Sequence, residues 1–395
     1  MRLPFCFIML FYSGQFTDYC RLFATFVSDM QLHSLTLTNF KNIPQAQLQF
    51  SNKINCFLGN NGMGKSNLLD AIFMLSFCKS FSGAPDAMVI RSGEEFAIAK
   101  GVYSRRNAAE ELTLGLKRGK RKTLKRGGKE YVKLSSHIGT FPLVMAAPQD
   151  IDLIRGSGEE RRRWMDMVIS QSSPRYLDAL IRYNGALEQR NKLLRDGVVD
   201  HNLYGAVECV MDAAAAVIHS SRAEWTRELG EIFHRRYASI AGTDESVGLR
   251  YISSLDSSTG GLLPLLDSAR RHDEIVRHTS VGPHRDDIEM QLDGMPMRRT
   301  GSQGQCKTFT VALRMAQYEF LHRASGLRPL LLLDDIFDKL DAGRVERIMN
   351  LVTSDEFGQI FITDTDRSHL HSIVDRATGG DHRLWLSLIH ISEPT

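Results

Sequence analysis

The residues with the clearest chemistry form one short run near the start of the chain. They are Gly59, Asn60, Asn61, Gly62, Met63, Gly64, Lys65 and Ser66, which fit the spacing G-x-x-x-x-G-K-S. Glycines at these positions let backbone N–H groups face phosphate oxygens, while the lysine reaches the outer phosphates and the serine hydroxyl ligates Mg²⁺. An apolar run ends at Leu58, and apolar positions recur at helical spacing from Leu68 to Phe73. Strand, loop and helix in this order predict a P-loop, rather than a glycine-rich turn.

A second candidate set lies far down the chain, where Pro329 and four leucines lead into Asp334 and Asp335. A continuous apolar run predicts a central parallel strand that is buried on both faces, and ligands bind at the carboxyl ends of such strands. We expect Asp334 to hold Mg²⁺, directly or through water, and Asp335 to orient or deprotonate the attacking water. Together with Lys65 they form the predicted catalytic set for ATP hydrolysis. The alternative is a strand followed by an acidic turn.

A third segment, residues 300–305 with the sequence TGSQGQ, precedes a helical pattern and is named the signature segment here. Ser302 and Gly304 offer a hydroxyl and backbone donors at the positive end of that helix, which in isolation indicates only a helix cap. The position between P-loop and acidic strand resembles the ATP-binding-cassette arrangement, in which one subunit's signature closes over nucleotide held by the other. The resemblance implies a homodimer with two shared ATP sites, where Ser302 and Gly304 contact the partner's γ-phosphate.

Basic residues crowd one hairpin-like stretch between two further candidate strands. They are Lys117, Arg118, Lys120, Arg121, Lys122, Lys125, Arg126 and Lys129. Such concentrated charge repels itself unless an anion neutralises it, and a DNA backbone would do so without its sequence being read. A solvated turn is an equal alternative. Arg162, which lies in a basic run that opens a helix, is a further candidate for contact with DNA, a partner or solvent.

The composition is that of an ordinary soluble protein, with 395 residues, 43% hydrophobic, 24% charged and a net charge of +3. This charge is too mild to establish nucleic-acid binding by itself. Six scattered cysteines without a C-x-x-C pair argue against a zinc site or a disulfide framework and suit a reducing cytoplasm. Side chains alternate direction in an extended segment, so His284 to Asp287 predict a polar network rather than a metal cluster.

The sequence predicts an α/β fold: an ATP-binding-cassette P-loop ATPase head, with a mixed sheet flanked by helices, and a helical second domain. Residues 30–157 are the expected N-terminal lobe with the P-loop, 158–274 a mainly helical insertion broken at Gly197, and 275–386 the C-terminal lobe with signature and acidic strand. At about 1.5 Å per residue, the helical insertion is too short for a long coiled-coil arm.

Both ends of the chain fall outside this pattern. Residues 1–29 contain Arg2 and an apolar run from Leu3 to Tyr12, which is similar to a weak signal sequence but has no convincing cleavage site and is too short to span a membrane. We expect a non-conforming extension from an upstream start rather than export. Residues 387–395 form a non-conforming tail with no assigned role.

With these residues in view, the chain resembles the RecF family of bacterial recombination mediators, which is related to the ATPase heads of SMC proteins. Beyond the P-loop, the likeness rests on four strings in the family's order: residues 32–42 (LHSLTLTNFKN), 147–166, 189–191 and 282–287. It runs from about Met30 to about Leu386. Gln149 departs from the family, which commonly has an acidic residue there. Asp335 replaces the glutamate of transport cassettes, and its shorter side chain predicts slow hydrolysis.

The resemblance implies a cytoplasmic, weakly active, DNA-stimulated ATPase that uses ATP and Mg²⁺, with Lys41 and Asn42 as additional nucleotide contacts. It implies an ATP-dependent homodimer on double-stranded DNA near single-strand gaps, with no membrane association. RecR and RecO are the implied partners in loading RecA during recombinational repair, replication restart and SOS induction. Two rivals are the ATPase of a membrane transporter and a clamp that binds ATP but scarcely hydrolyses it.

Overall fold

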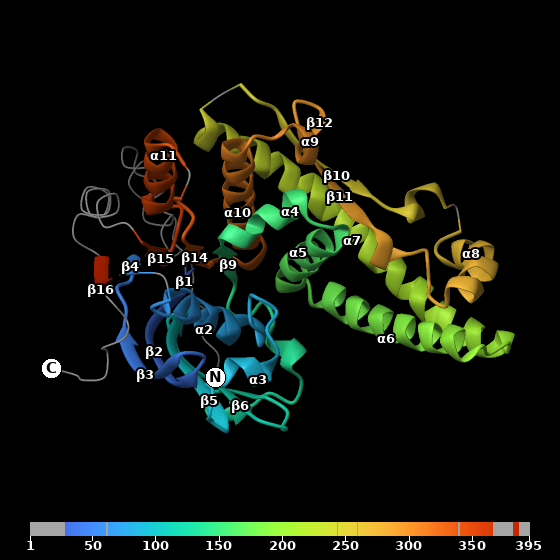
Figure 1. Cartoon of the computed structure of the whole chain (residues 1–395), viewed down its shortest axis with the longest axis horizontal. Coiled ribbons are helices and arrows are strands. Elements are labelled where there is room, and N and C mark those ends of the chain that lie inside the picture. Colours follow the sequence, from blue (N-terminus) through green and yellow to red (C-terminus); the bar gives the residue numbers. More distant parts are fainter. Residues whose placement is uncertain are drawn as a thin grey trace, which may run out of the picture.

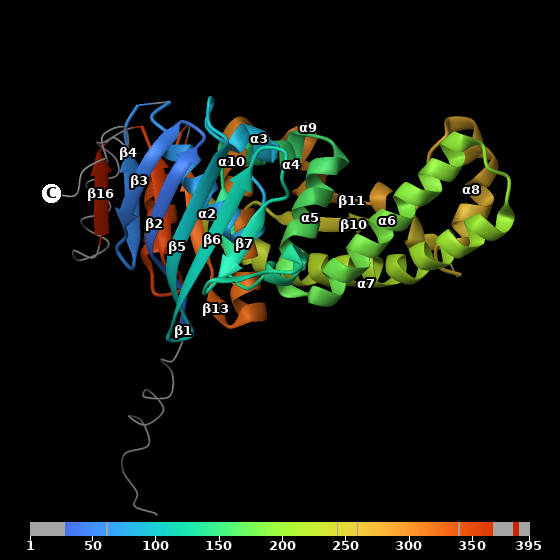
Figure 2. The same cartoon turned by 90° about the horizontal axis from the view of Figure 1, so that it is seen from below.

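A computed structural model describes residues 28–60, 62–242, 244–258, 260–338, 340–365 and 382–386. The chain forms a head with two sheets, from which a helical arm projects to one side (Figure 1, Figure 2). Residues 1–27 and 387–395, which hold most of the two expected non-conforming ends, lie outside the described residues, as does Asn61. Within the expected N-terminal extension, strand β1 (Ser28–Asp29) pairs in parallel with β13 (Leu327–Arg328).

The central sheet is parallel and has the order β16-β4-β15-β14-β9. Its strands are β4 (Ile54–Leu58), β9 (Leu143–Ala146), β14 (Leu330–Asp334), β15 (Ile360–Asp364) and β16 (His382–Leu386). Every residue of β4, β9, β14 and β15 is buried, which confirms the two central strands predicted from their apolar runs. The carboxyl ends of β4, β14 and β15 therefore meet at one edge.

The second sheet of the head is antiparallel and has the order β3-β2-β5-β6-β7-β8. Its strands are β2 (Gln31–Phe40), β3 (Ile43–Gln49), β5 (Phe96–Arg105), β6 (Ala108–Lys117), β7 (Thr123–Arg126) and β8 (Lys129–Glu130). Helix α2 (Lys65–Phe77) contacts strands of both sheets and buries eleven of its thirteen residues between them. Short helix α3 (Asp86–Val89) follows it. The result is the predicted mixed α/β head.

The helical arm consists of α5 (Gly158–Ser172), α6 (Pro174–Asp196), α7 (His201–Ala241) and α8 (Leu263–Val276). Helix α6 ends at Gly197, whose φ of 66° places it in the left-handed conformation that glycine adopts at little cost. Among the described helices, α7 is long and apolar enough to cross a membrane by length and composition, with a window of mean hydropathy 1.2. Core helices pass the same test, and α7 packs against α6, α10 and β10.

The remaining elements join the arm to the C-terminal part of the head. A small sheet pairs β10 (Val247–Ile252) with β11 (Asp287–Leu292) and β11 with β12 (Met295–Pro296). The β10–β11 pairing connects segments on either side of the expected boundary at residue 274. Helices α4 (Asp152–Arg155), α9 (Met297–Thr300), α10 (Gln303–Ser325) and α11 (Ala342–Thr353) complete the fold.

Two ion pairs, of which the first is buried, join the arm to the start of β11. Arg222 of α7 lies 3.1 Å from Asp286, and Arg161 of α5 lies 2.6 Å from Asp287. His284 Nδ1 lies 2.7 Å from the Tyr183 hydroxyl. These contacts confirm the polar network predicted for residues 284–287. Separating Arg222 from Asp286 would leave an uncompensated buried charge. This pair therefore holds the arm and the head in one relative position.

Candidate nucleotide-binding site

The P-loop connects the end of β4 to the start of α2 and turns at glycines. Gly62 and Gly64 have φ values of 82° and 87°. This backbone conformation is sterically unfavourable for residues that have a Cβ atom. At Gly64 a Cβ would also lie only 3.0 Å from Asn42 Oδ1. The loop can therefore adopt this path only with glycine at these positions, as the spacing of the motif predicts.

Lys65 is 7% exposed and folds back over the loop. Its Nζ donates hydrogen bonds to the carbonyl oxygens of Gly59, at 2.5 Å, and Asn60, at 3.1 Å. The ammonium is thus held at the mouth of the loop by acceptors that are weaker than a phosphate oxygen. This arrangement fits a residue that binds the outer phosphates of a nucleotide.

The two predicted magnesium ligands meet although they are 268 residues apart in the sequence. Ser66 Oγ, at the start of α2, donates to Asp334 Oδ1 at 3.0 Å, and Thr363 Oγ1 donates to the same oxygen at 2.6 Å. Burial raises the pKa of Asp334, while the two hydroxyl hydrogen bonds oppose that shift. A hydroxyl and a carboxylate at the end of a buried strand are hard oxygen ligands of the kind Mg²⁺ binds, so these residues fit the metal.

Asp335 follows β14 with a φ of 50°, in the left-handed region that Asp and Asn tolerate better than most residues. Its N–H donates to Thr363 Oγ1 at 3.1 Å and to the Thr363 carbonyl oxygen at 3.2 Å. A cavity of about 190 Å³ brings the predicted set together. It is lined by Gly62, Met63, Gly64, Lys65, Ser66, Asn67, Asp334, Asp335 and Thr363.

Thr363 was not predicted as a site residue. It contacts both acidic residues and lies on β15, the strand between β4 and β14. The apolar run of residues 360–362, again followed by two polar residues, is the sequence signal that could have predicted this strand.

Lys41 and Asn42 occupy the turn between β2 and β3, directly beside the P-loop. Asn42 Nδ2 donates to the Gly62 carbonyl oxygen at 3.3 Å, and its Oδ1 accepts from Asn67 at 2.7 Å. Lys41 Nζ lies 2.6 Å from Asp70 on α2. Both residues therefore support the loop. They also line an open groove together with Met88, Arg91 and Arg118, among others.

The signature segment forms a capping box at the start of α10. The Ser302 N–H donates to Gln305 Oε1 at 2.9 Å, and the Gln305 N–H donates to Ser302 Oγ at 3.2 Å. Ser302 is exposed, and neither it nor Gly304 lines the cavity at the P-loop of its own chain. The signature cap therefore lies outside the P-loop cavity of its own chain.

The basic hairpin divides into residues that are used within the chain and residues that are free. Lys122 Nζ binds Asp86 at 2.7 Å, Arg126 forms a two-point pair with Glu110, and Arg118 Nε donates to the Glu94 carbonyl oxygen at 2.8 Å. Five others are exposed, and their side chains have no hydrogen bond or ion pair to another described residue. They are Lys117, Lys120, Arg121, Lys125 and Lys129.

Arg162 also has a partner within the chain. It is half-buried, and its Nη1 donates to the Asp286 carbonyl oxygen at 2.8 Å. Desolvation lowers its pKa, and nearby Asp287 opposes the shift. With Lys122 and Arg126, Arg162 therefore has a structural role that does not depend on a ligand.

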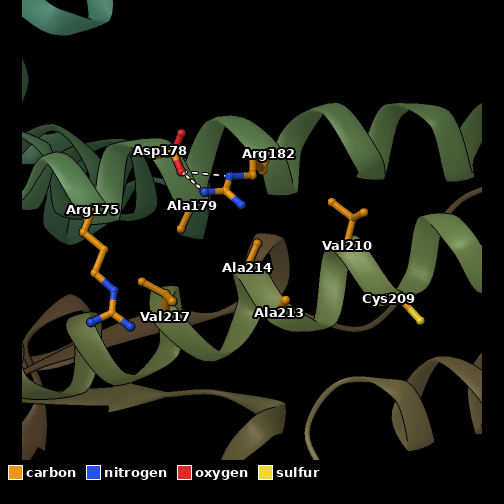
Figure 3. A pocket seen from close by; sticks show the side chains of 9 residues that line it. All are labelled: Arg175, Asp178, Ala179, Arg182, Cys209, Val210, Ala213, Ala214 and Val217. Carbon is orange, nitrogen blue, oxygen red and sulfur yellow. Dashed lines mark hydrogen bonds and ion pairs between the residues drawn. The ribbon is translucent and has the colours of Figure 1, made fainter.

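A different groove, in the arm, lies away from these residues. It measures about 350 Å³ between α6 and α7, with Arg175 at one end and Val210 on its rim (Figure 3). Ala179 of α6 faces Ala213 and Ala214 of α7 across it, and Asp178 is paired with Arg182, whose Nε lies at 2.8 Å. The lining of this groove has neither the Asp334–Asp335 pair nor the glycines that line the P-loop cavity.

A parallel sheet with a P-loop after β4, carboxylates after β14 and a capped signature helix defines an ATP-binding-cassette type ATPase head. Residues 31–380 match the family described as RecF/RecN/SMC N terminal domain. The chain is 48% identical to the DNA replication and repair protein RecF of Parabacteroides distasonis over 345 residues, which cover 87% of this chain and 94% of that protein. It is 47% identical to RecF of Bacteroides fragilis over 358 residues, covering 90% and 96%. The chain belongs to the RecF family.

Solved structures agree with this assignment. A structure titled as the recombination mediator protein RecF-ATPrS in the RecFOR pathway matches with a TM-score of 0.80 and 28% identity, over 87% of this chain and 94% of that one. The SMC head domain of Pyrococcus furiosus matches with a TM-score of 0.52 and 16% identity, over 87% and 92%, and this likeness concerns the fold alone. The predicted family and head fold are confirmed, and family membership removes the transporter alternative.

Replacing Asp334 by asparagine is expected to stabilise the protein in the absence of nucleotide and metal. Burial raises the pKa of Asp334, so the folded state binds its proton more tightly than the unfolded state does. Stability from this group is present below the unfolded-state pKa and is lost as the pH rises through the raised value. Asp334→Asn should therefore raise the Tm near neutral pH, with the gain shrinking toward the ordinary aspartate pKa of about 3.9.

Asp341→Asn is the matched control for this thermal-unfolding series. The Arg344 N–H holds the pKa of exposed Asp341 below its ordinary value, so loss of that charge should give no gain near neutral pH. An Asp334→Asn protein that melts at or below the wild-type Tm at neutral pH would contradict the expectation.

Proposed function

We propose that this chain is an ATP-dependent, DNA-binding recombination mediator. ATP and Mg²⁺ bring two copies together, the closed dimer holds double-stranded DNA near a single-strand gap, and hydrolysis reopens it. The observation that carries this proposal is the division of one chain into two half-sites. The P-loop with Asp334 and Asp335 forms one half, and the exposed Ser302 cap, which does not line the same cavity, forms the other.

Each residue of the first half-site has a role that follows from its position. The P-loop backbone and Lys65 bind the phosphates, and Ser66 and Asp334 would hold Mg²⁺, which would supply neutralisation of negative charge on the outer phosphates. Asp335, held at the same edge by Thr363, orients the attacking water. Lys41 and Asn42 support the loop and border the adjoining groove, where the nucleoside lies.

The remaining roles rest on family membership. The relatives are DNA replication and repair proteins by name, and the similar solved structure is titled as a component of the RecFOR pathway. On this basis the chain acts with RecR and RecO to load RecA in gap repair, replication restart and SOS induction. DNA stimulates its weak ATPase activity, and it acts in the cytoplasm.

The dimer model is tested by replacing Ser302 with arginine. With a non-hydrolysable ATP analogue and Mg²⁺, the wild-type protein should sediment as a dimer. Ser302→Arg should remain a monomer, because a long side chain at the helix cap obstructs the partner's phosphates, while nucleotide affinity of the isolated chain is unchanged. Ser220→Arg, at an exposed position of α7, controls for the added arginine. A wild-type protein that stays monomeric, or a Ser302→Arg protein that dimerises normally, would overturn the model.

DNA binding is proposed to use the free half of the basic hairpin. Reversing Lys117, Lys120, Arg121 and Lys125 to glutamate should weaken binding to gapped DNA by about tenfold or more at low salt. The slope of log K against log salt should shrink by about 0.9 for each lost phosphate contact. Fluorescence anisotropy across a salt series measures both quantities.

A set of four exposed basic residues on the arm controls for net charge in this experiment. They are Arg175, Lys192, Arg195 and Arg271. Equal losses of affinity in both sets would show that total charge, rather than the hairpin, governs binding. Unchanged affinity after reversal of the hairpin residues would remove this surface from the proposal.

A further inference from the structure

Arg344, in the first turn of α11, lies against the signature segment. A Cβ placed on Gly304 would come within 3.0 Å of Arg344 Nη1, so the guanidinium contacts the backbone at that glycine. Its Nε lies 3.3 Å from Asp341, and the side chain is 20% exposed. The guanidinium is thus anchored at one edge by its own helix, while its other edge lies beside the proposed γ-phosphate contact.

The guanidinium of Arg344 lies beside the start of α10, at Gly304. The start of α10 carries the positive end of the helix dipole, which favours anions and disfavours cations. An anion bound between the guanidinium and the positive end of α10 would interact favourably with both charges.

We propose that Arg344 completes the ATP site of the partner subunit by binding the γ-phosphate of the nucleotide on the partner's P-loop. The inference rests on the proposed function, because it requires the signature of one copy to face the P-loop of the other. A planar guanidinium matches phosphate oxygens with two parallel hydrogen bonds. Arg344 thereby distinguishes a triphosphate from a diphosphate and makes closure depend on ATP.

The position of Arg344 in the chain connects the two sites of the dimer. Helix α11 begins seven residues after Asp335, so the loop that leaves the acidic strand of one site leads to the arginine that serves the other. When one site loses its γ-phosphate, Arg344 of the other subunit loses a contact. Helix α11 of that subunit follows its own Asp335 along the chain, so the change can reach the second site.

Arg344→Gln tests the assignment. Binding of a fluorescent ATP analogue to the isolated chain should match wild type, whereas the dimer dissociation constant with a non-hydrolysable ATP analogue should rise at least about tenfold. Arg344→Lys keeps the positive charge but cannot form two parallel hydrogen bonds to a phosphate, so it should restore dimer affinity only in part. Arg347→Gln, one turn along α11, removes hydrogen bonds to the carbonyl oxygens of Ile240 and Ala241 and should lower thermal stability without this nucleotide-specific effect.

Mixed dimers distinguish action on the partner from action on the residue's own site. Arg344→Gln mixed with Lys65→Met assembles one complete site only if Arg344 acts across the interface. The mixture should then regain turnover that neither variant has alone, up to about half of the wild-type rate, because each mixed dimer has one complete site of two. No recovery, or an Arg344→Gln protein that dimerises like wild type, would overturn the assignment. A wild-type protein that does not dimerise would instead refute the proposed function.

Discussion

Replacing Lys65 by methionine is expected to lower ATP affinity by about a hundredfold and to abolish ATP-dependent dimerisation. The side chain is 7% exposed and presents its ammonium at the P-loop mouth through two carbonyl acceptors. Methionine keeps the aliphatic stem but removes the charge that faces the outer phosphates. Losing a charge-assisted contact to a desolvated phosphate costs about 2–3 kcal/mol. Titration with a fluorescent ATP analogue measures the affinity, and sedimentation measures the dimer.

Lys192→Met is the control for this substitution, since Lys192 is an exposed lysine of α6 in the arm. It should bind ATP and dimerise like wild type. A Lys65→Met protein that retains dimerisation with the non-hydrolysable analogue would show that closure does not depend on phosphates held at the P-loop.

Asp335→Asn should lower turnover by about a hundredfold or more while preserving ATP binding and the dimer. Asparagine tolerates the φ of 50° at this position and keeps the N–H bonded to Thr363, so the backbone is retained and only the carboxylate is lost. General-base assistance contributes typically about 10²–10⁴ to the rate. Steady-state phosphate release measures turnover, and sedimentation should show dimers that persist with ATP.

This experiment also separates a slow enzyme from a clamp. Glu346→Gln, on the exposed side of α11, is the matched carboxylate control and should leave turnover unchanged. If the wild-type rate already equals that of Asp335→Asn, the carboxylate has no part in hydrolysis and the clamp interpretation holds.

The elements that carry the nucleotide site were predictable because each has a strong local pattern. The run from Leu330 to Leu333 is buried throughout, and the motif glycines adopt the positive φ values that the P-loop requires. The signature segment was predicted to cap a helix, and Ser302 does so. In each case the structure depends on a few neighbouring residues, through their hydrophobic periodicity or the steric limits on their backbone.

Features that depend on contacts distant in sequence were not predictable. Thr363 joins the site only because β15 pairs with both β4 and β14, and strand order is not encoded in any one segment. The charge run at the hairpin gave no sign that Lys122 would pair with Asp86, or that Arg126 would pair with Glu110. Likewise, the pairing of β10 with β11 crosses a boundary that helical periodicity alone placed near residue 274.

The order of strands has a consequence for synthesis of the protein. Strand β15 lies between β4, which leads into the P-loop, and β14, which ends at Asp334. A nascent chain cannot unite these two strands until Ile360–Asp364 has left the ribosome, long after β4 has been made. Contacts of such long sequence separation also slow folding. Prematurely terminated products that lack this strand will carry an intact P-loop sequence without a working ATP pocket.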